Sequence, residues 1–283
     1  MLTATELQAL LAAHGLRLTK RLGQHHLIDA RIIQRIVESC KLSREETVVE
    51  IGAGLGALTE PLAQRASRVI AVEVDRRIAA LLTERMASLS HVTVVHRDIL
   101  AWSWDGLQGA VVVGAIPYQI TSPIFVWLCE HRSHIRKAVL IVQEEVAQRL
   151  AAGPGSKVYG RLSVLGQYGW EIRSLFRVPR SAFFPQPVVD SSCVELTART
   201  HPAVAVDDEA VFFRVVKAAF AQRRKTLVNC LSANDEPLVS RAETEALVQQ
   251  VGLPRSIRGE RLSLAQFAQI ANALTRSNSL REK

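Results

Sequence analysis

The chain has 283 residues, of which 48% are hydrophobic and 22% are charged, and its 35 Lys and Arg residues outnumber its 27 Asp and Glu residues to give a net charge of +8. This composition suits a packed α/β domain with a smaller appendage and excludes a low-complexity chain. No apolar run is long enough to cross a bilayer, and the first 18 residues lack the pattern of a signal peptide. We expect a cytoplasmic, monomeric protein without membrane contact.

The basic excess suggests a polyanionic partner, and nucleic acid is the one we expect. The alternative is that a modest positive charge only aids solubility. Clustering of the basic residues favours binding, and the clusters are Lys20-Arg21, the group Arg173, Arg177 and Arg180, and the run Arg223-Arg224-Lys225.

The four cysteines lie far apart along the chain, with no paired spacing suited to zinc or to redox chemistry. We expect reduced and mostly buried thiols, and no metal site. They are Cys40, Cys129, Cys193 and Cys230.

Strand patterns alternate with helix patterns up to about residue 143. The β-branched apolar run at residues 47–51 predicts a buried parallel strand, and similar strands are predicted at residues 68–74, 92–96, 110–114 and 137–143. Helices are predicted between them at residues 58–65, 76–86 and 123–130. This alternation predicts a Rossmann-like α/β fold whose parallel sheet is covered on both faces.

Residues 170–178 and 191–196 alternate apolar and polar side chains, with a turn-rich segment between them. They predict an antiparallel pair that closes one edge of a mostly parallel, seven-stranded sheet.

Strand signals stop after about residue 200. Asp207-Asp208-Glu209 suits a helix start, a second helix is predicted over residues 238–250, and Ser263 with Gln266 forms a capping-box pattern before a third. We therefore divide the chain into an α/β domain at residues 1–200 and a small all-α domain at residues 201–283.

The sequence Glu-Ile-Gly-Ala-Gly-Leu-Gly at residues 50–56 ends the first strand and predicts a cofactor loop. Its glycines allow a tight turn and close approach of a ligand, and the following helix start can meet an anionic group. Glu73 ends the second strand, where a carboxylate can bind ribose hydroxyls, and Asp98 follows the third, placed to meet an adenine amine. The Gly-x-Gly-x-Gly spacing and the second acid favour S-adenosyl-L-methionine over a nicotinamide dinucleotide. The remaining alternative is a turn that needs glycine, beside acids that cap helices.

The fourth predicted strand leads into Ala115-Ile116-Pro117-Tyr118, which resembles the Asn-hydrophobic-Pro-Tyr catalytic loop of adenine amine methyltransferases except that Ala115 stands where that loop has Asn. Other markers occur in order along the chain at residues 20–25, 50–56, 73–75, 181–187, 189–191, 220–226 and 261–264. With them the chain closely resembles the small-subunit ribosomal RNA adenine N6-dimethyltransferases (the KsgA/Dim family), and less closely the Erm methyltransferases.

The resemblance implies a cofactor site for S-adenosyl-L-methionine. Gln24, His25 and Leu27 would line its methionine end, Gly52 and Gly54 would pass beside it, Glu73 would hold the ribose, Asp98 would hold the adenine, and Ala115 would adjoin it.

The resemblance also implies a site for the target base. Ala115, Ile116, Pro117 and Tyr118 would present the adenosine, Tyr118 would stack on it, and Phe183 would close over it, with Phe184 a weaker candidate. The exocyclic amine is a poor nucleophile, so acceptors that orient it matter, and the carbonyl of Ile116 remains one of them. Aromatic stacking would compensate for the flipped base leaving its stack.

Two departures from the family stand out. Ala115 lacks the side-chain acceptor for the amine, which would cost on the order of 1–3 kcal/mol in the transition state, with Gln119 a nearby candidate for compensation. His26 replaces the usual Phe and is expected to pack as a flat ring.

The resemblance implies that the substrate is a hairpin in the immature small ribosomal subunit, in which two adjacent adenosines each receive two methyl groups. Arg223, Arg224 and Lys225 are expected to extend a helix with an apolar opposite face and to contact RNA phosphates, unless they are a solvated helix end. Two alternatives stay open: a ribosome assembly factor with weak or no catalysis because of Ala115, and an Erm-like enzyme acting on large-subunit RNA.

Overall fold

The structure is a computed structural model, which describes residues 2–16, 25–232 and 238–279. Contacts divide the chain into two compact units. The sheet unit comprises Met1–Ala147 and Glu171–Ala198, and the helical unit comprises Gln148–Trp170 and Arg199–Lys283. The domain boundary near residue 200 stays a prediction, and the helical unit also takes in a segment from the middle of the chain.

The sheet has seven strands in the order β4-β3-β2-β5-β6-β9-β7. The neighbouring strands β4, β3, β2, β5 and β6 are parallel to one another. Strand β9 runs antiparallel to β6, and β7 is the edge strand beyond β9. This confirms the predicted mostly parallel, seven-stranded sheet. The strands are β2 (Thr47–Ile51), β3 (Arg68–Glu73), β4 (Val92–His96), β5 (Ala110–Ala115), β6 (Ile135–Gln143), β7 (Trp170–Val178) and β9 (Ser191–Ala198).

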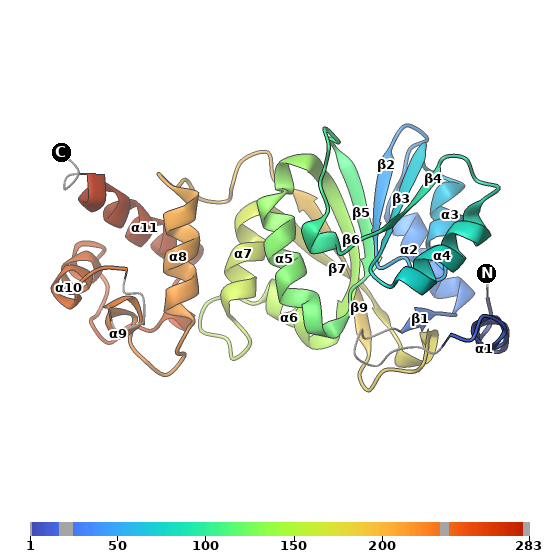
Figure 1. Ribbon diagram of the computed structural model, residues 1–283. Coiled ribbons are helices and arrows are strands. Elements are labelled where there is room, and N and C mark those ends of the chain that lie inside the picture. The colour runs from blue at the N-terminus through green and yellow to red at the C-terminus, as the bar shows by residue number, and fades with distance from the viewer. Residues whose placement is uncertain (1, 17–24, 233–237, 280–283) are drawn as a thin grey trace. The chain divides into compact units, whose positions relative to one another are not determined.

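Helices pack on both faces of this sheet, which is why the central strands are continuous apolar runs. Ile33 and Ile36 of α2 and Leu62 of α3 pack on one face against Val48 and Val111. Figure 1 shows α2, α3 and α4 on one side of the sheet and α5 on the other. The helices of this unit are α1 (Ala4–Ala13), α2 (Ala30–Ser39), α3 (Thr59–Ala63), α4 (Arg76–Met86), α5 (Thr121–Glu130) and the first part of α6 (Glu144–Ala151).

The order of the strands places the candidate site. Strand β2 lies between β3 and β5, so the chain leaves it first to one side and later to the other. Ligands of such sheets bind at this reversal, outside the carboxyl ends of the strands. The glycine loop after β2, Glu73 at the end of β3 and Ala115 at the end of β5 all lie at that edge.

A short antiparallel pair joins two distant segments at the same edge. Strand β1 (His26–Leu27) pairs with β8 (Phe183–Phe184), so that His26 lies opposite Phe184 and Leu27 opposite Phe183. Two-residue strands have too little sequence pattern to predict, and the sequence did not indicate this pairing.

The helical unit contains α7 (Arg161–Gly169), α8 (Glu209–Ala219), α9 (Leu227–Ser232), α10 (Arg241–Gln250) and α11 (Leu264–Ser279). Asp208 caps α8, and the predicted capping box is present: the Ser263 N–H donates to Gln266 Oε1 at 2.9 Å and the Gln266 N–H donates to Ser263 Oγ at 3.2 Å. Helix α10 begins at Arg241, capped by Ser240, three residues later than predicted. The short helix α9 was not predicted.

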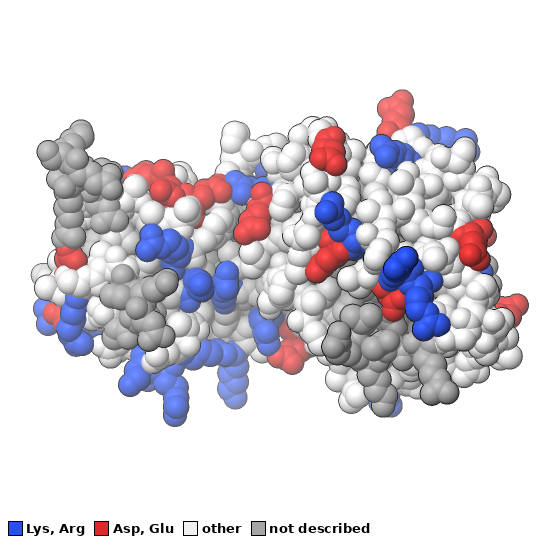
Figure 2. All heavy atoms as spheres, in the orientation of Figure 1, with Lys and Arg blue, Asp and Glu red and all other residues white. Residues whose placement is uncertain are grey.

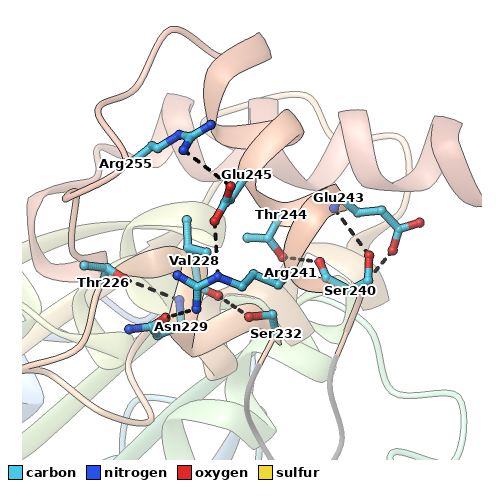
Figure 3. Close-up of polar contacts among 10 residues, drawn as sticks. All are labelled: Thr226, Val228, Asn229, Ser232, Ser240, Arg241, Glu243, Thr244, Glu245 and Arg255. Carbon is cyan, nitrogen blue, oxygen red and sulfur yellow. Dashed lines mark hydrogen bonds and ion pairs between the residues drawn. The ribbon is translucent and has the colours of Figure 1, made fainter.

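Polar side chains connect α9 and α10 (Figure 3). Arg241 donates to Asn229 Oδ1 at 3.0 Å and to Glu245 Oε1 at 3.2 Å, and Glu245 also pairs with Arg255 at 3.5 Å. These contacts link the two helices and the segment that follows α10.

None of the described helices is long and apolar enough to span a membrane. Within the described ranges, no group of three or more His, Cys, Asp or Glu side chains could hold a metal ion. All four cysteines are buried, as predicted.

Candidate functional site

The glycine loop after β2 forms one wall of the site. Gly52 and Gly54 have φ angles of 65° and 55°, in the left-handed region that other residues rarely adopt. A Cβ on Gly52 would meet no protein atom within 4 Å, whereas one on Gly54 would lie 2.9 Å from the His26 ring. The loop therefore turns sharply and leaves open space beside Gly52.

The Glu73 carboxylate is buried beside this loop, with 6% of the residue exposed. It accepts hydrogen bonds from the backbone N–H of Gly54 at 2.8 Å and of Asp75 at 2.9 Å. Burial raises the pKa of this carboxyl, and the backbone donors oppose the rise. Each oxygen keeps a second lone pair for a ligand hydroxyl.

Asp98 follows β4 and is exposed. Its side chain accepts from the Leu100 N–H at 3.0 Å and caps the short 3₁₀ helix η2 (Ile99–Ala101). The capping interpretation of this acid therefore holds, and the same residue also lines the cavity described next.

A cavity of about 230 Å³ connects these features, and we call it the glycine-loop cavity. The described residues predicted to bind a cofactor all line it: His25, Leu27, Gly52, Gly54, Glu73, Asp98 and Ala115. Gln24, also predicted there, lies outside the described residues. Gln119, the candidate to compensate for Ala115, lines it as well.

A second, smaller cavity of about 20 Å³ is lined by the residues predicted to act on the target base, and we call it the tyrosine cavity. Its lining residues are His25, Ala115, Ile116, Pro117, Tyr118, Ile141, Phe183 and Ser191. Tyr118 Oη lies 3.5 Å from Ser191 Oγ. Phe184 does not line it and packs instead against the hydrophobic cluster that includes Leu7 and Leu11 of α1.

His25, Ala115 and Pro117 are the residues that the two cavities share. The His25 Nδ1 lies 2.6 Å from the carbonyl oxygen of Pro185, and its imidazole stacks on the Tyr118 ring with centroids 5.9 Å apart. Ala115, predicted in the catalytic loop, and His25, predicted to bind the cofactor, therefore both line the junction of the two cavities.

Glu50 is a site residue that the sequence interpretation did not single out. Only 2% of the residue is exposed, it lines the glycine-loop cavity, and the Thr59 hydroxyl donates to its Oε2 at 2.6 Å. Burial raises the pKa of Glu50 to about 8. The sequence signal that could have indicated Glu50 as a site residue is its position in the glycine motif.

His26 packs beside the glycine loop as the flat ring that was predicted. Burial lowers the pKa of His26 to about 4, and its Nε2 is buried without a hydrogen-bond partner in the described part of the chain. The neutral ring fills space against Gly54.

The basic run of the helical unit differs from its prediction. Helix α8 ends at Ala219, so Arg223, Arg224 and Lys225 lie in the turn before α9 and do not extend the helix. The backbone of Gly259 closely approaches the carbonyl of Ala219, where a Cβ would lie 2.5 Å away, so this end of the helix is closely packed. Figure 2 shows Lys and Arg side chains gathered along the lower edge of the helical unit.

Arg223 makes hydrogen bonds to other residues of the helical unit. Its Nη2 donates to the carbonyl of Lys157 at 2.9 Å and to Glu260 Oε2 at 3.1 Å. All three residues of the run are exposed, so the contacts of Arg223 are what distinguish it from Arg224 and Lys225.

The parallel sheet, the glycine loop at its reversal point and the buried acid after the next strand form a Rossmann-like site for a nucleoside cofactor. Similarity to known proteins identifies the class as methyltransferases that use S-adenosyl-L-methionine. The chain belongs to the ribosomal RNA adenine dimethylase family, whose sequence profile matches residues 15–276.

Relatives agree over nearly the whole chain. The ribosomal RNA small subunit methyltransferase A of Geobacillus thermodenitrificans is 43% identical over 274 residues, 94% of each protein. The protein of the same name from Bacillus mycoides is 44% identical over 275 residues, 92% of each.

Solved structures share the fold. A dimethyladenosine transferase from Plasmodium falciparum superposes with a TM-score of 0.74 at 24% identity, covering 90% of this chain and 98% of its own. The 23S rRNA methyltransferase ErmE superposes with a TM-score of 0.64 at 29% identity, covering 88% and 99%.

Proposed function

We propose that the protein transfers methyl groups from S-adenosyl-L-methionine to the N6 atoms of two adjacent adenosines in a hairpin of small-subunit ribosomal RNA, as a cytoplasmic monomer, during maturation of that subunit. The observation that carries this proposal is the junction of the two cavities at Ala115 and Pro117. A methyl donor in one cavity and a base in the other would meet there.

The described residues fit the cofactor. Gly52 leaves open space where a side chain would intrude, and the buried Glu73 carboxylate has lone pairs for both ribose hydroxyls. In this proposal Asp98 binds the adenine amine, while Gln24, His25 and Leu27 surround the methionine end. The bound cofactor supplies an electrophilic methyl group, and the chain's residues orient the acceptor.

The tyrosine cavity supports base binding by its composition. Tyr118 and Phe183 offer aromatic faces to a flipped adenine, and the carbonyl of Ile116 accepts from its amine. At about 20 Å³ the cavity is smaller than a purine, so its rings must separate when a base enters. Ala115 leaves the amine with one acceptor fewer than Asn would provide.

RNA binding is assigned to the basic turn of the helical unit. Arg224 and Lys225 are exposed and can contact phosphates, which position an RNA without reading its sequence. Arg223 shares this assignment, although it is also bound to Glu260.

The second candidate function is that of an assembly factor that binds the immature subunit and methylates weakly or not at all. Ala115 favours it, because the loop lacks its side-chain acceptor. The test is to incubate the protein with methyl-labelled cofactor and either under-methylated small subunits or large subunits. The proposal expects label in small-subunit RNA alone. Label in large-subunit RNA would contradict the substrate. No label from wild type beside full transfer by an Ala115→Asn variant would contradict the enzymatic function and favour the assembly factor.

A further inference from the structure

His25 stands at the place where the methyl donor and the base would meet. Three described residues line both cavities, and of these Ala115 and Pro117 have no polar side-chain atom, so among them His25 alone has a polar side chain. It comes from the segment before β1 and not from the catalytic loop.

The contacts of His25 define which ring nitrogen can accept a proton. The Pro185 carbonyl can only accept a hydrogen bond, so at 2.6 Å the neutral ring carries its proton on Nδ1. Nε2 then holds the free lone pair, and no described residue donates to it. Stacking on Tyr118 fixes the plane of the ring as well.

We propose that His25 is a catalytic residue whose Nε2 accepts the proton of the target amine, in the place left without a side-chain acceptor by Ala115. This inference rests on the proposed function and assigns it a further group. The amine lone pair forms the new N–C bond as the S–C bond of the donor breaks, and the donor loses its positive charge. The nitrogen is then left with one proton too many, which Nε2 takes and the half-buried imidazolium releases to water.

Other ionisable groups also line the two cavities, and the role proposed for His25 must be distinguished from any role of theirs. They are His26, Glu50, Glu73, Arg97, Asp98 and Tyr118. His26 is not an equivalent candidate, because it lines the glycine-loop cavity but not the tyrosine cavity. Gln119 and Ser191 each line only one of the two cavities.

A double-mutant cycle tests the assignment. Single-turnover methyl transfer is measured for wild type, His25→Phe, Ala115→Asn and the double variant, with His201→Phe, an exposed position of the helical unit, as the matched control. Phe keeps a ring against Tyr118 but has no lone pair. General-base contributions are about 10²–10⁴-fold, so we expect His25→Phe to lose about 100-fold in the wild-type background and less than about 10-fold in the Ala115→Asn background.

The same fold loss in both backgrounds would overturn the proposal, as would an unchanged rate. His25→Asn guards against misfolding, because its amide can still donate to Pro185 but takes up no proton. We expect it to bind cofactor and to stay slow. A wild-type rate for His25→Asn would refute the role of His25 as the base. If wild type transfers no methyl while Ala115→Asn does, the proposed function fails, and this inference fails with it.

Discussion

The Glu73 carboxylate accepts a hydrogen bond from the backbone N–H of Gly54 at 2.8 Å, across 19 residues of sequence. Gly54 lies in the glycine loop after β2, and Glu73 ends the neighbouring strand β3. The bond therefore couples the shape of the loop to the acid proposed to hold the cofactor ribose. It also explains why this carboxyl is buried without an ion pair among the described residues.

Changing Glu73 to Gln is expected to weaken cofactor binding about 10- to 100-fold, because hydrogen bonds to a charged acceptor contribute about 1.5–3 kcal/mol. Titration calorimetry measures the change. Glu84→Gln, at an exposed position of α4, is the matched control and should bind like wild type. An unchanged affinity for the Glu73 variant would remove the assignment.

Restoring the acceptor with Ala115→Asn is expected to raise the rate of methyl transfer. A missing hydrogen bond costs on the order of 1–3 kcal/mol, and each 1.4 kcal/mol is about tenfold in rate. Because His25 supplies an acceptor at the same junction, we expect a gain near the lower end, about tenfold, in single-turnover experiments. A rate below that of wild type would mean that Ala115 is adapted to its neighbours.

Glu50 should make the free protein less stable at alkaline pH. Its folded-state pKa of about 8 lies above the ordinary value of 4.5, so the fold favours the protonated carboxyl. Its contribution is complete below about pH 4.5 and is lost as the pH rises through about 8. Glu50→Gln keeps an acceptor for Thr59. We expect this variant to lack the pH-dependent loss of folding stability, which in wild type is on the order of a few kcal/mol.

Urea unfolding at pH 5.5 and pH 8.5 measures this effect, with Glu84→Gln again as the control. A Glu50 variant whose stability falls between the two pH values as much as that of wild type would show that the buried carboxyl is not the cause.

Within the basic turn, Arg223 should have a structural role in addition to RNA binding, and Arg224 should not. Arg223→Ala removes the bonds to Glu260 and to the Lys157 carbonyl and should cost about 0.5–1.5 kcal/mol of stability. Arg224→Ala should leave stability unchanged and lower the salt dependence of RNA binding by about one ion. Thermal unfolding and filter binding at several salt concentrations test both. Equal effects of the two variants on stability would contradict this difference between Arg223 and Arg224.

Much of the fold could be predicted because local pattern and tertiary structure agree. The runs at residues 47–51, 92–96 and 170–178 are strands with the predicted ends, and α4 has its predicted bounds. Helix α9 was missed because its six residues give too little periodicity. The helix predicted through Arg223 stops at Ala219, where a distant glycine packs against its end.

The sequence indicated many of the residues that line the two cavities, but it did not indicate which residue joins the cavities. Glycine spacing and acids after strands indicated Gly52, Glu73 and Asp98, because parallel strands end at one edge of a sheet. That His25 joins the two cavities depends on the β1–β8 pair and on the carbonyl of Pro185, which lies 160 residues away. Contacts over that separation leave no pattern in a single sequence.

The identity of the methylated nucleosides tests the proposed function most directly. Small subunits isolated without this methylation are incubated with the wild-type protein and S-adenosyl-L-methionine, and the RNA is digested and analysed by mass spectrometry. We expect N6,N6-dimethyladenosine at two adjacent positions of one hairpin. Unmodified adenosine at those positions, from protein that binds the subunits and the cofactor, would contradict the proposed function.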